Sequence, residues 1–168
     1  MALVSVLIAL AITTPALPAP SDCLWNAAGE RQRQAWLSQY NTDPAGLLKT
    51  TLAADLTASL AAACKVPGDK VRNLLVARTM ENGAEAFWDR DMQNSGALGR
   101  SWEGLSEAHR VQLRRWAATA IVDGNGEESE LDGLPAFAKG AGLTDPNGPG
   151  MRHLMGYMLG RGYRELAS

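Results

Sequence analysis

The stretch Ser106–Val122, SEAHRVQLRRWAATAIV, decides the fold class of this chain. Its apolar residues recur at intervals of three and four, so they share one face of a helix, and Ser106 is a favourable N-cap because its hydroxyl can accept a backbone N–H bond. The pattern predicts a helix over Glu107–Val122, with Trp116 at the centre of the core. The inward stripe consists of His109, Leu113, Trp116, Ala117 and Ala120.

The composition around this stretch extends the helical prediction to the rest of the chain. From Ser21 onward there are 22 Ala and 18 Leu but only 5 Val and 1 Ile. This balance favours helix over a sheet of β-branched residues and excludes all-β and Rossmann-type folds. We therefore expect an all-α fold, a compact bundle of about six helices. They are expected over Gly29–Tyr40, Pro44–Cys64, Asp69–Asp89, Glu107–Val122, Leu134–Ala141 and Met151–Leu166.

Three local patterns set the expected helix boundaries. A stripe formed by Leu48, Leu52, Leu56 and Leu60 predicts that Pro44–Cys64 is one continuous helix. The pair Asn82-Gly83 predicts a break or kink in the helix that begins at Asp69. The segment Gln93–Gly99, which is rich in Asn, Gly and Ser, predicts a loop.

The amino-terminal segment predicts export. Leu3–Thr14 is an uncharged apolar run of 12 residues, which suits a signal-peptide core but is too short for a stable membrane anchor. We expect residues 1–16 to be a signal peptide that is cleaved off. The latest alternative position for the cleavage is residue 20. Residues 21–168 are then a single helical domain in the periplasm or secreted, without a membrane anchor.

The chain has two cysteines, Cys23 and Cys64. An even number of cysteines in an exported chain predicts a disulfide between them. Two buried free thiols are one alternative, and a catalytic redox pair is another. The residues lack the CxxC spacing that tunes a reactive thiolate.

Charge and motif patterns exclude several classes of function. Sixteen basic against eighteen acidic residues give a net charge of −2, so no global positive field exists to hold nucleic acid. Zinc spacings, phosphate loops and dinucleotide glycine patterns are absent from the sequence, and we expect no metal and no cofactor. The acidic loop Asp123–Glu130 lacks the glycine and the closing glutamate of a calcium loop. The stripe of Met151, Met155 and Met158 is interpreted as core rather than as a copper site.

The last predicted helix carries a candidate binding face. Gly156 and Gly160 lie one turn apart, next to four cationic or aromatic side chains. One interpretation is tight packing of the helix against a neighbour. The functional hypothesis is a docking groove whose arginines bind an acidic partner protein through paired hydrogen bonds. The residues of this hypothesis are His153, Tyr157, Arg161 and Arg164.

Three carboxylates at helical spacing form the candidate catalytic site. Glu81, Glu85 and Asp89 follow one another at intervals of four residues. Glycoside hydrolysis uses a pair of carboxylates held several ångströms apart. Like charges at this spacing also occur on ordinary solvated helix faces.

The sequence favours a function in binding over a function in catalysis. We expect a non-enzymatic protein of the inhibitor, immunity or envelope-accessory kind, and an exported cell-wall glycoside hydrolase is the alternative. Two observations separate them. A deep cleft with two carboxylates, one of raised pKa, would favour the enzyme, whereas a shallow apolar or cationic patch would favour the binding protein.

Overall fold

A computed structural model describes residues 19–124 and 131–167 of the chain. Within these ranges the regular secondary structure is entirely helical, and no strand is formed. The all-α prediction is therefore confirmed, but the described residues form nine helices rather than six. Their bounds are α1 Pro20–Ala27, α2 Glu30–Thr42, α3 Pro44–Leu47, α4 Ala54–Cys64, α5 Gly68–Arg90, α6 Ala97–Glu103, α7 Glu107–Asp123, α8 Leu134–Gly140 and α9 Pro149–Ala167.

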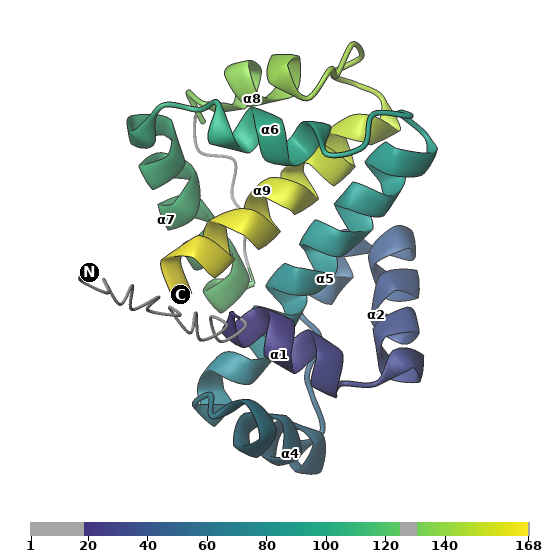
Figure 1. Ribbon diagram of the computed structural model, residues 1–168, viewed down its shortest axis with the longest axis vertical. Coiled ribbons are helices and arrows are strands. Elements are labelled where there is room, and N and C mark those ends of the chain that lie inside the picture. Colours follow the sequence, from purple (N-terminus) through teal and green to yellow (C-terminus); the bar gives the residue numbers. More distant parts are fainter. Residues whose placement is uncertain (1–18, 125–130, 168) are drawn as a thin grey trace, which may run out of the picture.

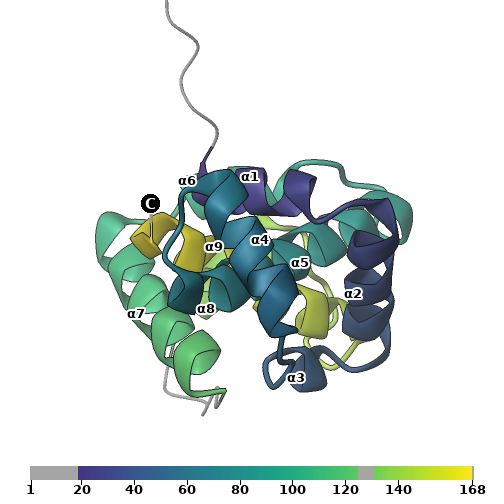
Figure 2. The ribbon, with the colours of Figure 1, turned by 90° about the horizontal axis from the view of Figure 1, so that it is seen from below.

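Helices α5 and α9 form the centre of the molecule. Helix α9 packs along α5 on one side and along α7 on the other. Helices α1, α2 and α4 lie around one end of α5, while α6 and α8 lie at the opposite end (Figures 1 and 2). Neighbours thus cover both sides of α9, and ten of its 19 residues are buried.

Two apolar clusters form the core, one at each end of the α5–α9 pair. The first includes Trp36 and Leu75, and the second includes Trp102 and Phe137. Trp116 contacts both clusters but is only partly buried. The prediction that it lies at the centre of the core is therefore wrong, although its stripe partners Leu113, Ala117 and Ala120 are buried as expected.

Helix α7 begins as the sequence predicts. The Ser106 hydroxyl accepts a hydrogen bond from the backbone N–H of His109 at 3.2 Å. This bond satisfies one of the amide groups that the first turn leaves unpaired. The expected end at Val122 differs by one residue from the observed end at Asp123.

The expected helix over Pro44–Cys64 is interrupted between α3 and α4. Thr50 lies in the interruption, where its hydroxyl accepts a hydrogen bond from Gln39 Nε2 at 2.7 Å. Its carbonyl oxygen accepts another from Arg72 Nε at 3.0 Å. These bonds to α2 and α5 take the place of helical ones, so tertiary contacts override the leucine stripe.

Helix α5 continues through Asn82-Gly83, so the predicted break is wrong. A Cβ atom at Gly83 would overlap the ring of Tyr40, which packs directly against the backbone there. The glycine therefore permits contact with α2 instead of ending α5. The expected loop over Gln93–Gly99 is also shorter than predicted, because α6 begins at Ala97.

The structure pairs Cys23 with Cys64, whose sulfur atoms lie 2.08 Å apart. This pairing was predicted from the sequence. It connects α1 to the last residue of α4, which otherwise lies at the edge of the molecule (Figure 1). Two positions that are 41 apart in the sequence are thereby joined, which closes the segment between them into a loop.

Two sequence predictions fall outside the described residues. These are the signal peptide over residues 1–16 and most of the acidic loop Asp123–Glu130. Within residues 19–124 and 131–167, no helix combines the length and the apolar character needed to span a bilayer.

Candidate functional site

The face of α9 that was expected to bind a partner is largely inside the protein. His153 is 3% exposed and Tyr157 is 1% exposed, so these two residues do not form a contact surface. The physical reason is that α5 and α7 cover α9 from both sides. The helix therefore buries this face in addition to the Met158 and Leu154 side.

The glycines of α9 serve tight packing, not docking. A Cβ atom at Gly156 would overlap the Tyr40 hydroxyl, and one at Gly160 would overlap the carbonyl oxygen of Ala77. A Cβ atom at Gly162 would lie 3.0 Å from the Cβ of Ala117 on α7. The proposed docking groove at Gly156 and Gly160 is thus already filled by α2 and α5.

Replacing Gly160 by Ala is expected to lower the free energy of unfolding by about 2–3 kcal/mol. The added Cβ meets backbone atoms of α5, including Glu81 N at 2.8 Å, which cannot rotate away. Chemical denaturation measures the change. Gly68→Ala is the control, because nothing lies within 4 Å of the added atom, and we expect a change below about 0.5 kcal/mol there. Equal midpoints for the two variants would contradict the packing argument.

His153 lies in an aromatic pocket between α2, α5 and α9. Its Nδ1 is 3.1 Å from the Tyr40 hydroxyl, and its ring stacks on Phe87 with centroids 3.9 Å apart. Burial, with a further contribution from the Arg152 cation, lowers the pKa of His153 to about 4. The folded protein therefore holds this imidazole neutral at pH values where the unfolded chain would be protonated.

This pKa predicts that the fold loses stability in mild acid. Between pH 6.5 and about 4 the unfolded state binds more protons at His153 than the folded state, so the free energy of unfolding falls as pH falls. The loss attributable to His153 is about 3 kcal/mol when complete. Urea unfolding at pH 7 and pH 4.5, for the parent and for His153→Gln, measures it. If both proteins lose the same stability in acid, His153 is not the group responsible.

A buried carboxylate at the centre of α5 joins residues from two separate sequence hypotheses. Glu81 is 1% exposed and makes ion pairs with Arg78, Arg161 and Arg164. Arg78 NH1 lies 3.3 Å from Glu81 Oε2, and Arg161 NH1 lies 3.5 Å from Oε1. We call these four residues the Glu81 cluster. It unites the catalytic candidate Glu81 with the binding candidates Arg161 and Arg164.

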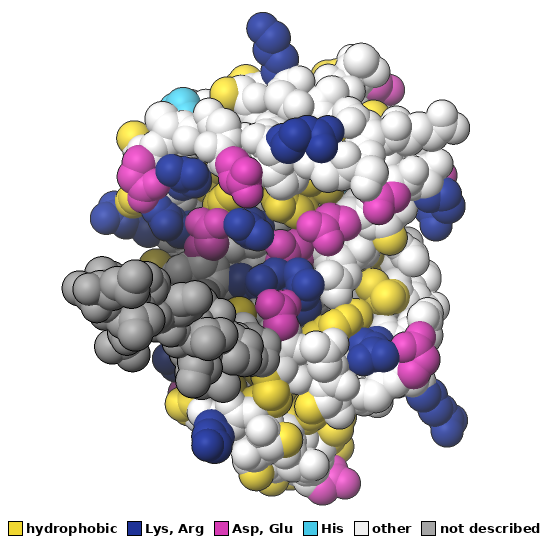
Figure 3. Space-filling view, in the orientation of Figure 1, with side chains coloured by type: hydrophobic (Ala, Val, Ile, Leu, Met, Phe, Trp, Pro, Cys, Tyr) yellow, Lys and Arg dark blue, Asp and Glu magenta, His cyan; other side chains and the backbone are white. Residues whose placement is uncertain are grey.

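The Glu81 cluster continues into neighbouring helices. Asp22 of α1 lies 3.0 Å from Arg78 Nε, and the Ser21 hydroxyl accepts a hydrogen bond from Arg164 Nε at 2.9 Å. Glu165 accepts hydrogen bonds from Arg161 Nε and from Trp102 Nε1, each at 2.8 Å. Figure 3 shows acidic and basic side chains side by side across the middle of the face that is turned to the viewer in Figure 1. The charges are mutually compensated, so Arg161 and Arg164 are not free to recruit an acidic partner.

The other two candidate carboxylates differ in their surroundings. Glu85 is half-buried, and burial together with the nearby Glu81 carboxylate raises its pKa. Asp89 is exposed to solvent. Both carboxylate oxygens of Glu81 are held by arginines, so Glu81 does not offer the free base that a glycosidase pair requires.

An open groove on another part of the surface combines apolar and cationic side chains. Lys49 and Arg152 are both exposed on its rim, and neither forms an ion pair within the described part of the chain. Its volume is about 390 Å³. We call it the α3–α9 groove. The lining residues are Pro44, Ala45, Leu48, Lys49, Met80, Trp116, Gly124, Arg152, Met155, Gly156 and Leu159.

A second hollow adjoins this groove. Leu48, Lys49 and Gly124 line both, and the second hollow extends along the α3–α4 loop to Val122 and Asp123 at the end of α7. Val122 is 58% exposed, which is unusual for a large apolar side chain in the described residues. The two hollows adjoin and form one surface built from α3, α5, α7, α9 and the α3–α4 loop.

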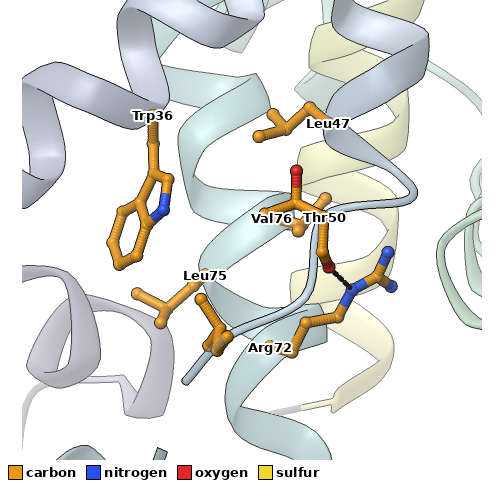
Figure 4. A pocket seen from close by; sticks show the side chains of 7 residues that line it. Trp36, Leu47, Thr50, Arg72, Leu75 and Val76 are labelled. Carbon is orange, nitrogen blue, oxygen red and sulfur yellow. Dashed lines mark hydrogen bonds between the residues drawn. The ribbon is translucent and has the colours of Figure 1, made fainter. Parts of the chain in front are cut away.

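The cavity in Figure 4 has a different character. Trp36, Leu47, Leu75 and Val76 point toward one another beneath the α3–α4 loop, and Arg72 donates to the Thr50 carbonyl at its edge. Its volume is about 10 Å³, which is room for one water-sized sphere. It is a small packing gap and not a ligand site.

The sequence did not point to the α3–α9 groove. Its rim cations are about a hundred positions apart in the chain and belong to no motif. Trp116, which lines the groove, belongs to a stripe that the sequence analysis singled out, but that stripe was interpreted as part of the core. Among the described residues, no group of histidines, cysteines and carboxylates is arranged to hold a metal ion. Comparison with protein-family models, curated proteins and solved structures finds no significant match.

Proposed function

We propose that this chain is a non-catalytic binding protein whose binding surface is the α3–α9 groove. One observation carries the proposal: Lys49 and Arg152, two exposed cations without an ion partner among residues 19–124 and 131–167, line a groove with an apolar floor. Apolar centres with polar rims are characteristic of protein contact sites. The charge of the Glu81 cluster, by contrast, is satisfied internally.

The binding surface proposed from the structure lies on a different side of α9 from the one that the sequence predicts. Arg161 and Arg164 pair with the buried Glu81. The cation that α9 offers to a partner is instead the exposed Arg152, near the start of the same helix. Met155 and Leu159 follow at intervals of three and four residues, which places them on the same side of the helix as Arg152. The helix thus offers a charged residue and two apolar residues to the groove.

We further propose that the protein acts outside the cytoplasm, as an inhibitor, immunity-type or envelope accessory factor. The apolar run Leu3–Thr14 supports export, and a disulfide between Cys23 and Cys64 is compatible with an oxidising compartment.

The hydrolase alternative has less support. The raised pKa of Glu85 favours a proton donor at that position. Its neighbour Glu81 is neutralised by three arginines, and Asp89 is exposed. Glu85 and Asp89 line none of the hollows described above, so no cleft is seen around the remaining two carboxylates, and we retain binding as the proposal.

An anionic apolar dye, anilinonaphthalene sulfonate, tests the proposed surface. We expect the native protein to bind it, and the double variant Lys49→Glu with Arg152→Glu to bind about tenfold more weakly, because the rim then repels the sulfonate. The matched control is Lys70→Glu with Arg115→Glu, since both cations are exposed, neither lines the groove, and neither has an ion partner in the described part of the chain. Equal affinity in the two double variants would place dye binding elsewhere and contradict the proposal.

A further inference from the structure

We infer that the α3–α9 groove receives an acidic segment of another protein, which places an apolar side chain on the groove floor and carboxylates at Lys49 and Arg152. The inference rests on the proposed function and names the partner of that same site. It follows from the charge at the rim, the openness of the floor and the apolar surface that continues beside it.

The rim selects for negative charge. Lys49 comes from the loop after α3 and Arg152 from α9, and the fold brings both into the lining of one groove. Both side chains are exposed, and within residues 19–124 and 131–167 no carboxylate neutralises either of them. An arginine binds a carboxylate through two parallel hydrogen bonds, while a lysine supplies a mobile point charge.

The floor suits a side chain rather than a free lipid. Met80 and Met155 are flexible side chains that adapt to irregular shapes, and Trp116 adds a broad apolar ring. Small-molecule sites commonly bury most of their ligand. This groove is open along one side, so an acyl chain lying in it would remain partly in water, whereas a protein segment brings its own cover.

The neighbouring surface also fits a protein partner. Val122 is 58% exposed in the adjoining hollow, beyond the reach of a ligand confined to the groove. A protein segment lying across Leu48 and Gly124, the residues shared by the two hollows, would cover both. Apolar centres of protein interfaces are made in this way from several adjacent side chains.

Selection from a phage-displayed library of random dodecapeptides on the full chain tests the inference. We expect the selected peptides to combine aspartate or glutamate with a leucine, methionine or aromatic residue. Synthetic peptides of these sequences should bind the Lys49→Glu with Arg152→Glu variant about tenfold more weakly than the parent. The Lys70→Glu with Arg115→Glu variant should bind them like the parent, and far-UV circular dichroism verifies that both variants are folded.

Three results would overturn the inference. Selected peptides without acidic enrichment, peptides that bind both double variants equally, or a selection that enriches no peptide each exclude an acidic segment. Dodecanoate, tested as a competitor of the dye, separates this failure from failure of the proposed function. If dodecanoate displaces the dye while no acidic peptide binds, the groove takes a lipid and the proposed function stands; if the dye does not depend on the groove, both fail.

Discussion

Replacing Glu81 by Gln is expected to lower the free energy of unfolding by about 3 kcal/mol, at the lower end of the range for a broken buried ion pair. The substitution preserves the shape of the side chain but leaves Arg78, Arg161 and Arg164 without the carboxylate that they share. Asp22 and Glu165 remain close to these arginines and limit the loss. Urea unfolding at pH 7 measures the change.

Glu107→Gln is the matched control for this prediction. Glu107 also pairs with two arginines, Arg110 and Arg114, but its side chain is 62% exposed. Exposed ion pairs contribute little because water screens them, so we expect a much smaller loss of stability than for Glu81→Gln. If Glu81→Gln and Glu107→Gln lower the free energy of unfolding by the same amount, burial does not set the strength of the Glu81 cluster. The cluster would then not stabilise the packing of α1, α5 and α9 more than a surface ion pair does.

Removing the disulfide is expected to lower the free energy of unfolding by about 4 kcal/mol on the chain-entropy model, because the two cysteines are 41 positions apart in the sequence. In a domain of this size the loss corresponds to roughly 10 °C in Tm. Cys23→Ser, Cys64→Ser and the reduced parent should all lose this amount, and thermal unfolding followed by circular dichroism measures it.

The double variant Cys23→Ser with Cys64→Ser provides the control. Because the cross-link can be lost only once, its Tm should match that of each single variant. A double variant that loses twice as much would show that the effect comes from the side-chain packing of the two cysteines and not from the closed loop. A reduced parent with an unchanged Tm would also contradict the prediction.

Local signals determined the helical class and the longest helices. The excess of Ala and Leu over β-branched residues favours helix at every position, and the Ser106 cap fixes the start of α7 within the chain itself. The pairing of Cys23 with Cys64 was also accessible, because two cysteines allow only one bridge within the chain. The short helices α1 and α6, with 8 and 7 residues, do not extend over enough turns for a periodic pattern to stand out, and they were missed.

Non-local contacts decided where helices stop and how closely they approach. Thr50 is held by Gln39 and Arg72, which are distant in sequence, so its helix ends against the local pattern. Gly83 and Gly160 have the sequence signature of a break and of a groove. In the structure both are places where another helix touches the backbone. A glycine reports that space is needed but does not say what fills it.

The Glu81 cluster was predictable residue by residue but not as an arrangement. Glu81, Arg161 and Arg164 each attracted attention in the sequence, yet their pairing joins positions about eighty residues apart. That pairing turned two functional hypotheses into one buried ion cluster.

Sequence by itself therefore determined that this protein is helical and cross-linked, since propensity and cysteine number act within short segments or independently of geometry. Only the tertiary structure decided which face of α9 is buried and which cations lack an ion partner among the described residues. Burial depends on all the neighbours of a helix at once, and those neighbours come from both ends of the chain. Lys49 and Arg152 line one groove for the same reason, because they are about a hundred positions apart in the sequence and only the fold brings the loop after α3 and the start of α9 together.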